Sequence, residues 1–161
     1  APYQLIHGKL VFMASPYFNH QRISGKLNAL LVTHVYDKGL GEVVSAPMDV
    51  HFDEENVFQP DLLFVSIRRR SIIDRWIKGA PDFVVEILSA STEKIDRELK
   101  MATYGKHNVL EYWIIKPQEE EVEVYLNENR QMALHQTAGK DDTLTSTAIE
   151  GLRVEVARLF A

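Results

Sequence analysis

The sequence predicts an α/β fold in which a helix, three strands, a second helix and a fourth strand follow one another closely. Apolar residues between about 16 and 36 recur at the three- and four-residue spacing of an amphipathic helix. Residues 42–52, 58–66, 82–89 and 110–116 are instead short runs rich in β-branched and aromatic side chains. The run 82–89 is apolar on both faces, which is typical of a central strand covered on both sides. We therefore expect a central mixed β-sheet flanked by helices.

Hairpins are expected at both ends of this core. Residues 3–6 and 9–14 flank His7-Gly8, a two-residue turn signal. Near the other end, residues 121–126 and 131–137 alternate apolar and polar side chains on either side of a turn. A short terminal element follows a polar loop.

The boundaries of the two helices can be predicted from their flanking residues. The first is expected to begin at Ser15-Pro16, because serine caps helices and proline suits the first turn, and to end at Gly39. The second is expected to be capped by Ser91 or Thr92 and to end near Gly105. Its expected inward stripe is Ile95, Leu99 and Ala102.

Composition limits the possible classes of protein and of site. A chain of 161 residues with 45% apolar side chains fits a single domain, residues 1–161. Because there is no cysteine, a metal would need oxygen or imidazole ligands. The longest apolar runs are strand-sized and no secretory leader opens the chain, so we expect a cytoplasmic protein with no membrane partner. The net charge of -5 argues against a purely electrostatic nucleic-acid binder but allows a local basic cleft.

Glu86 interrupts the strand that is expected to be buried on both faces. An unpaired carboxylate there would cost several kcal/mol, so something must compensate for its charge. A buried salt bridge, or a strand end that is open to water, is one explanation. The other is a metal ligand or a catalytic acid, because strongly compensated carboxylates in clefts tend to be functional.

Two Pro-Asp pairs offer a second carboxylate, at Asp61 and at Asp82. Asp82 lies four residues from Glu86 in the same strand, which at ~3.3 Å per residue separates them by ~13 Å, too far to share one cation. Asp61 lies on the preceding strand, and neighbouring strands are only ~4.8 Å apart. The sequence therefore favours Asp61 as the partner of Glu86 and a turn or strand-start role for Asp82.

Several strings around these carboxylates resemble those of a known family. They are QPDLLFVS at 59–66, GAPDFVVEILS at 79–89 and EYWI at 111–114, together with Asp96-Arg97, Lys100 and Tyr104. From about Tyr3 to Phe160 the chain resembles the Uma-two (Uma2) family of restriction endonucleases. That family is similar to the PD-(D/E)XK nucleases, and this resemblance implies a restriction-endonuclease-like fold whose core order matches the order predicted above.

The resemblance also implies site residues. Asp61, Glu86 and the carbonyl of Ile87 would bind Mg²⁺ or Mn²⁺, as the corresponding groups do in that superfamily. A lysine two residues after the acidic residue would help to activate water, but Leu88 stands there in this chain. Some relatives carry the lysine on the following helix, which matches Lys100. The alternative for Lys100 is a surface ion pair with Asp96, four residues before it.

Other residues of the helices and strands permit two interpretations. His20 shares the inward face of the first helix, and the resemblance places a histidine at the site, although a lone inward histidine is also common in cores. Gln59 could orient a ligand or pack a loop. Tyr104 and Trp113 are expected in the core, because one lies in a helix and the other in an apolar strand.

Together, these observations predict a metal-dependent endonuclease that hydrolyses phosphodiester bonds of nucleic acid, with DNA as the expected substrate. The alternative is a catalytically inactive nucleic-acid-binding or interaction module that retains the nuclease fold. Cutting both strands of a duplex would call for two copies of the site, and the hairpin at 121–137 offers an edge for pairing. We therefore expect a homodimer.

Overall fold

The computed structural model of the protein describes residues 2–13, 15–89 and 94–161, with the side chains of all of them except residues 95 and 96. The predicted helix caps Ser91 and Thr92, and the side chain of Ile95 in the predicted stripe, lie outside this part of the chain.

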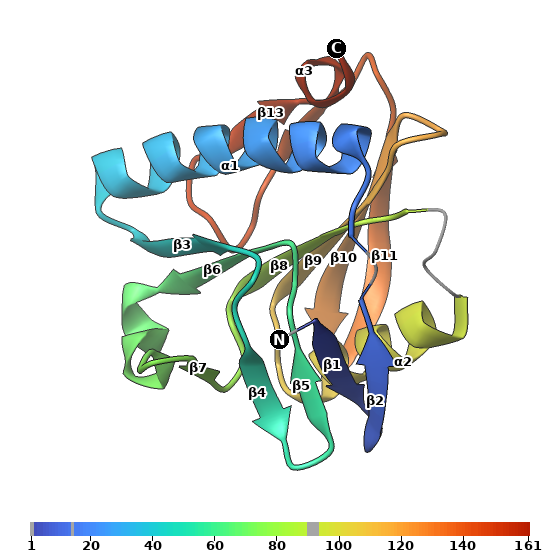
Figure 1. The fold of residues 1–161 in the computed structure, drawn as a ribbon. Helices are drawn as coiled ribbons and strands as arrows, with labels where there is room; N and C mark the ends of the chain where they lie inside the picture. Colours follow the sequence, from blue (N-terminus) through green and yellow to red (C-terminus); the bar gives the residue numbers. More distant parts are fainter. Residues whose placement is uncertain (1, 14, 90–93) are drawn as a thin grey trace.

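A six-stranded mixed sheet forms the middle layer of the fold (Figure 1). Its strands, in spatial order β11-β10-β9-β8-β6-β3, are antiparallel to their neighbours except for the parallel pair β8 and β9. The strand bounds are β3 Gly41–Ser45, β6 Leu62–Ser66, β8 Phe83–Ile87, β9 Glu111–Lys116, β10 Glu121–Glu128 and β11 Gln131–Ala138. The predicted central mixed sheet is confirmed, and the predicted hairpin near the C-terminus forms its edge.

Helix α1 (Phe18–Lys38) covers one face of this sheet, as Figure 1 shows. It buries four apolar residues at helical spacing: Ile23, Leu27, Leu31 and Val35. A small hairpin, β12 (Thr143–Thr145) with β13 (Arg153–Glu155), and helix α3 (Val156–Phe160) complete this layer. The helix ends at Gly39, as predicted, in the left-handed conformation with φ 63°.

The predicted start of α1 was wrong by two residues. The residue before the helix is Tyr17, and no side-chain hydrogen bond caps this end. Ser15 therefore lies too far ahead of the first turn to accept from its N–H groups, and the segment around Pro16 is a connection to α1 rather than its beginning.

A second sheet and helix α2 (Lys94–Lys106) cover the other face. The second sheet has the order β2-β1-β5-β4-β7. Its strands are β1 Tyr3–Ile6, β2 Lys9–Phe12, β4 Val50–Asp53, β5 Asn56–Phe58 and β7 Ile77–Lys78, and a short 3-10 helix, η1 (Ile67–Ile72), precedes β7. The N-terminal hairpin is confirmed, with positive φ at both His7 and Gly8.

Strand β8 contributes to both cores, which confirms that it is central. Phe83, Val85 and Ile87 pack with α1, whereas Val84 packs with the second sheet. Glu86 lies on the same side of the strand as Val84, because side chains alternate. Strand β8, which carries Glu86, is therefore covered by apolar layers on both sides.

Three predicted elements differ from the structure. Residues 42–52 form two strands in different sheets, since Pro47 cannot donate a ladder hydrogen bond and lies where the chain leaves β3. Residues 58–66 are likewise divided between β5 and β6, with Pro60 in the gap. In α2, Ala102 is exposed, whereas the next two residues, Thr103 and Tyr104, are buried.

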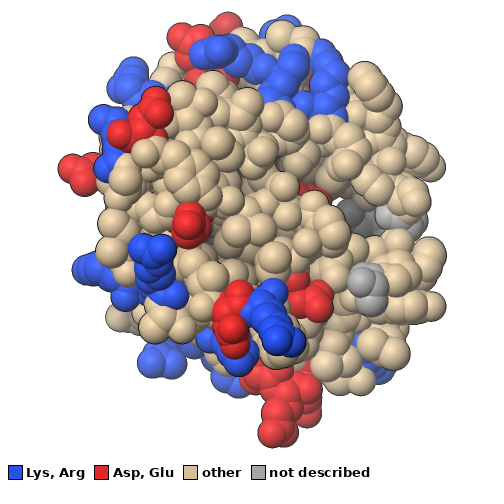
Figure 2. Space-filling model, turned by 60° about the vertical axis from the view of Figure 1, so that its left-hand side comes forward, with Lys and Arg blue, Asp and Glu red and all other residues tan. Residues whose placement is uncertain are grey.

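The surface carries both charges in mixed order. On the face drawn in Figure 2, Lys and Arg side chains gather towards the top and in the lower half with Asp and Glu side chains among them, and the described residues form no continuous basic stripe there. Within the described part of the chain, no helix is both long enough and apolar enough to cross a membrane.

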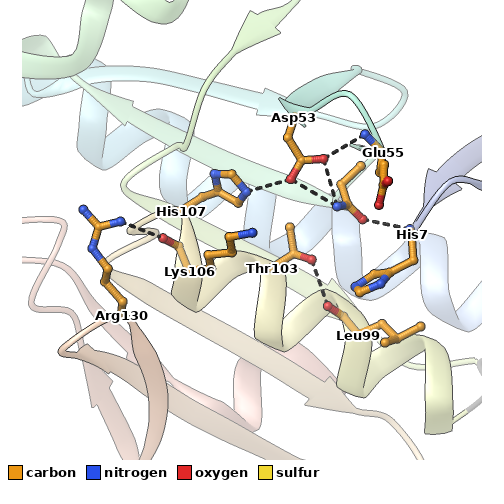
Figure 3. A network of polar contacts seen from close by, with 9 residues as sticks. His7, Asp53, Glu55, Leu99, Thr103, Lys106, His107 and Arg130 are labelled. Atoms are coloured by element: carbon orange, nitrogen blue, oxygen red, sulfur yellow. Dashed lines mark hydrogen bonds and ion pairs between the residues drawn. The ribbon is translucent and has the colours of Figure 1, made fainter.

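A polar network anchors the end of α2 to the β4–β5 turn (Figure 3). His107, just past the helix, lies 2.9 Å from a carboxylate oxygen of Asp53. Asp53 also accepts from the backbone N–H of Glu55 and from the side-chain amide of Asn56. The side-chain amide oxygen of Asn56 in turn accepts from the backbone N–H of His7. The network thus joins α2 to both hairpins of the second sheet.

We predict that Asp53→Asn destabilises the protein in a pH-dependent way. Burial would raise the pKa of Asp53, but the hydrogen bonds from Glu55 and His107 outweigh it and hold the pKa below the ordinary value of 3.8. A depressed folded-state pKa gives stability that is present above the unfolded pKa and is lost as the pH falls through the folded pKa. The loss in the free energy of unfolding should therefore be about 1 kcal/mol near pH 6 and should shrink towards about pH 3.

Urea unfolding of both proteins across this pH range measures the effect. The exposed neighbour Glu54 supplies the control variant Glu54→Gln, which should cost little at any pH. A difference between Asp53→Asn and the parent that did not change with pH would contradict the assignment.

Candidate active site

The pairing of β6 with β8 brings Asp61 and Glu86 together. The register pairs Leu62 with Val85, so Asp61, one residue before β6, stands opposite Glu86. Both side chains line a cavity of about 550 Å³ that opens between the start of α1, the N-terminal hairpin and α2. The structure therefore places the two carboxylates singled out in the sequence in one cavity.

The Asp61 carboxylate is held on both oxygens. One oxygen accepts from the backbone N–H of Ile87 at 2.7 Å, so a side chain takes the place of a backbone acceptor just beyond the paired residues of β6 and β8. The other lies 3.2 Å from Nε2 of His20, which α1 presents and which is 12% exposed. His20 is therefore part of this site and not a core residue.

Asp61 and its surroundings also set the charge of His20. Burial lowers the pKa of His20, but the hydrogen bond and the negative charge of Asp61 outweigh this effect and raise the pKa above 6.5. The backbone carbonyl of Ile87 raises it further as a hydrogen-bond acceptor. The backbone of Ile87 thus contacts Asp61 through its N–H and His20 through its carbonyl.

Glu86 is paired with the lysine of α2. Nζ of Lys100 lies 2.9 Å from one carboxylate oxygen of Glu86, and the lysine side chain is only 11% exposed. The same ammonium group lies 5.7 Å from the centre of the Phe58 ring. A surface location for Lys100 is therefore wrong, and the side chain of Asp96, its alternative partner, lies outside the described residues.

Two buried tyrosines bind the second oxygen of Glu86. The hydroxyls of Tyr104 and Tyr112 donate to it at 3.2 and 3.3 Å. Both side chains are fully buried, and burial, followed by the charge of Glu86, raises each pKa well above 10.0. Both phenols therefore stay protonated and remain donors at neutral pH.

The role of these tyrosines was missed in the sequence analysis. Tyr104 was expected only to fill the core, and Tyr112 appeared only in a resembling string. The signal was present, because tyrosine rather than phenylalanine at a buried position needs a partner for its hydroxyl. Trp113 is in the core, as expected.

The remaining candidates have distinct places. Asp82 is 2% exposed and accepts from the backbone N–H of Ser66, so it has the structural role predicted for it. Gln59 lines the cavity and donates to Asp49. Arg97, one turn of α2 before Lys100, also lines the cavity.

The oxygen donors of this site suit a hard cation. Carboxylates and a backbone carbonyl are ligands that Mg²⁺ accepts, and Mg²⁺ usually retains several waters, so two carboxylates can suffice. The described part of the chain contains no group of three or more His, Asp or Glu side chains that could hold a metal ion, so a cation here would have only two carboxylates and a backbone carbonyl as protein ligands. Asp61, Glu86 and Ile87 therefore fit a metal that is shared with water and a phosphate.

A family model described as "Putative restriction endonuclease", Uma2, matches residues 1–157. The chain belongs to the Uma2 family. The resemblance recognised in the sequence is thus confirmed, and the description of this family is that of a restriction endonuclease. No curated protein matches the chain.

One of two similar solved structures confirms the fold class. A crystal structure of "a putative nuclease belonging to DUF820 from Anabaena variabilis ATCC 29413" matches with a TM-score of 0.82 and 19% identity, over 98% of this chain and 89% of that one. The type IIG restriction endonuclease BpuSI matches with a TM-score of 0.41 and 14% identity, over 75% of this chain and 13% of that one. At 19% identity the first likeness shows the fold alone.

We predict that Tyr104→Phe lowers the stability of the protein by about 1–3 kcal/mol. The variant preserves the ring but removes a donor from a buried carboxylate, and hydrogen bonds to charged groups have this magnitude. In a domain of this size the melting temperature should fall by about 2–4 °C per kcal/mol. Differential scanning calorimetry measures both quantities.

Tyr125→Phe is the matched control. Its hydroxyl donates to Glu123 at 3.0 Å, but Tyr125 is only partly buried whereas Tyr104 is fully buried, so water can replace the hydroxyl that Tyr125→Phe removes. An equal loss in the two variants would show that Glu86 has no special need for its phenols.

Proposed function

We propose that the protein is a divalent-metal-dependent endonuclease that hydrolyses phosphodiester bonds of nucleic acid, with DNA as its substrate. The observation that carries the proposal is that Asp61 and Glu86 stand opposite each other at the ends of the paired strands β6 and β8 and line the same cavity. Membership of the Uma2 family supports it independently.

Asp61, Glu86 and the carbonyl of Ile87 would hold Mg²⁺ or Mn²⁺. A cation bound there would lower the pKa of a coordinated water and stabilise the negative charge that develops on the phosphate. The two strands fix both carboxylates before any ligand arrives, because each is already hydrogen-bonded to the backbone or to buried side chains.

The positive side chains around the carboxylates would let a phosphate approach. Two carboxylates alone would repel it, but Lys100 and Arg97 line the same cavity and His20 has a raised pKa beside Asp61. Lys100 would neutralise the phosphate or orient the attacking water from its position on Glu86. Lys100 would thus supply from α2 the positive charge that is missing just after β8, where Leu88 stands in place of a lysine.

The alternative, an inactive module with the nuclease fold, is based on Leu88. Leu88 stands where the superfamily usually has a lysine, but Lys100 reaches the same carboxylate from the helix.

The proposed homodimer is based on β11. This strand ends the six-stranded sheet and so has an edge that a second copy could extend. A dimer formed there would provide two sites for cutting a duplex.

We predict that Asp61→Asn abolishes metal-dependent cleavage without unfolding the protein. Asparagine keeps an oxygen acceptor for the N–H of Ile87 but removes the charge needed by the cation. Cleavage of plasmid and of single-stranded DNA in Mg²⁺ or Mn²⁺ should fall by about 100-fold or more, several kcal/mol of transition-state stabilisation. Gel assays with circular dichroism measure both aspects.

Asp74→Asn, at an exposed carboxylate paired with Lys78, is the control and should cleave normally. Equal cleavage by the parent and Asp61→Asn would refute the site. If the parent cleaved nothing, yet bound nucleic acid equally well with metal and with chelator, the inactive module would be correct.

We predict opposite effects of Lys100→Met on metal binding and on cleavage. A cation must share Glu86 with Lys100, so removing the lysine should increase the rise in melting temperature produced by Mn²⁺. Cleavage should nevertheless fall by about tenfold or more, because positively charged groups at a transferring phosphoryl are worth at least this much.

Lys106→Met, an exposed lysine of the same helix, is the control and should change neither quantity. A Lys100→Met protein with full cleavage would show that the lysine serves only to balance the charge of Glu86.

A further inference from the structure

Two exposed aromatic side chains stand on the wall of the same cavity. Phe12, at the end of β2, is 64% exposed, and Tyr17, just before α1, is 73% exposed. Both line the cavity that contains Asp61 and Glu86. Aromatic side chains usually lose most of their surface to the core, so two at the mouth of one polar cavity indicate a contact with something outside the chain.

Described residues between β2 and α1 form part of this wall. Met13, Ser15 and Pro16 line the cavity together with the two aromatic residues. Phe12 is supported from behind by an edge-on contact with Tyr3, with the ring centres 5.6 Å apart. Among the described side chains, Tyr17 has no ring contact of this kind. Its face is therefore open to a planar ligand.

The charges of the cavity do not suit the backbone of a duplex. Of the described residues that line the cavity, only Arg97 and Lys100 are Lys or Arg, and Lys100 is already paired with Glu86. The chain as a whole has a net charge of -5, and the face in Figure 2 lacks a continuous basic stripe among its described residues. Duplex binding depends on many phosphate contacts made by such residues.

Single strands are bound differently. Unpaired bases stack on aromatic side chains, and this stacking adds to the affinity that positively charged groups provide at the phosphates. A cavity lined by two aromatic residues and by Arg97, Lys100 and two carboxylates would hold a base and its neighbouring phosphate at the same time.

We infer that Phe12 and Tyr17 are a base-stacking site and that the substrate enters the cavity as single-stranded nucleic acid. The inference rests on the proposed function for the identity of the ligand. It adds the substrate class, a strand whose bases are unpaired next to the cleaved phosphodiester, and it removes the need for a dimer to cut both strands of a duplex.

Binding of a labelled oligonucleotide, measured by fluorescence anisotropy in chelator at one fixed salt concentration, tests the inference. The same strand is used free and annealed to its complement. The free strand should bind the parent about tenfold more tightly than the duplex. Phe12→Ala and Tyr17→Ala should each weaken single-strand binding by about 5- to 100-fold, as expected for the loss of one stacked base.

Matched variants separate stacking from a general loss of apolar surface. Phe18 is 80% exposed and adjacent to Tyr17 but does not line the cavity, so Phe18→Ala should bind as the parent does. Tyr17→Phe preserves the aromatic face and should retain affinity. The inference is overturned if duplex and single strand bind equally, if Phe18→Ala is as weak as Tyr17→Ala, or if Tyr17→Phe loses affinity.

The same variants distinguish this inference from its alternatives. If Phe12→Ala and Tyr17→Ala changed the sedimentation of the protein but not its binding of the free strand, this surface would be an interface between copies of the chain and the inference would be wrong. Cleavage in Mg²⁺ or Mn²⁺ is measured in parallel. Aromatic-dependent single-strand binding without cleavage would refute the proposed hydrolysis alone, whereas Asp61-dependent cleavage indifferent to both aromatic residues would refute the stacking site alone.

Discussion

The position of Glu86 in a covered strand determines much of the structure around it. Burying a carboxylate between two apolar layers is unfavourable unless hydrogen-bond donors and a positive charge surround it. Lys100 and Tyr104 come from α2, and Tyr112 from β9, so both elements must lie where they do to satisfy one side chain. The second core and the candidate site are consequently one packing arrangement, and α2 contributes side chains to both.

The Pro-Asp pair explains how the second carboxylate reaches the first. Proline has no N–H, so the regular ladder of β6 cannot extend back through Pro60. The next residue, Asp61, accepts from the N–H of Ile87 with its side chain rather than through a backbone carbonyl. A strand that begins in this way must direct a carboxylate towards the end of its neighbour. The geometry of the pair thus follows from local backbone chemistry, before any ligand is considered.

The sequence predicted the order of elements, the central strand and the Asp61–Glu86 pair, because all three depend on local periodicity or on strand spacing. It did not predict that residues 42–52 are divided between two sheets, since each half has strand character and Pro47, where the chain leaves β3, does not by itself show that the second half joins another sheet. The stripe of α2 was also wrong at Ala102. The helix instead buries Tyr104, whose hydroxyl donates to Glu86. Hydrophobic periodicity alone does not predict such a polar contact inside a core.

A second buried carboxylate shows what distinguishes a functional site from a structural one. Glu111 is fully buried in β9, but its oxygens accept from Trp113 at 2.6 Å, from the hydroxyl of Ser146 and from two backbone N–H groups. All these donors are neutral and belong to the chain, and Glu111 does not line the cavity. Glu86 instead has a charged partner, the ammonium group of Lys100, and a cavity beside it. A charged partner and access to a cavity, and not burial alone, are therefore the features on which the proposed role of Glu86 rests.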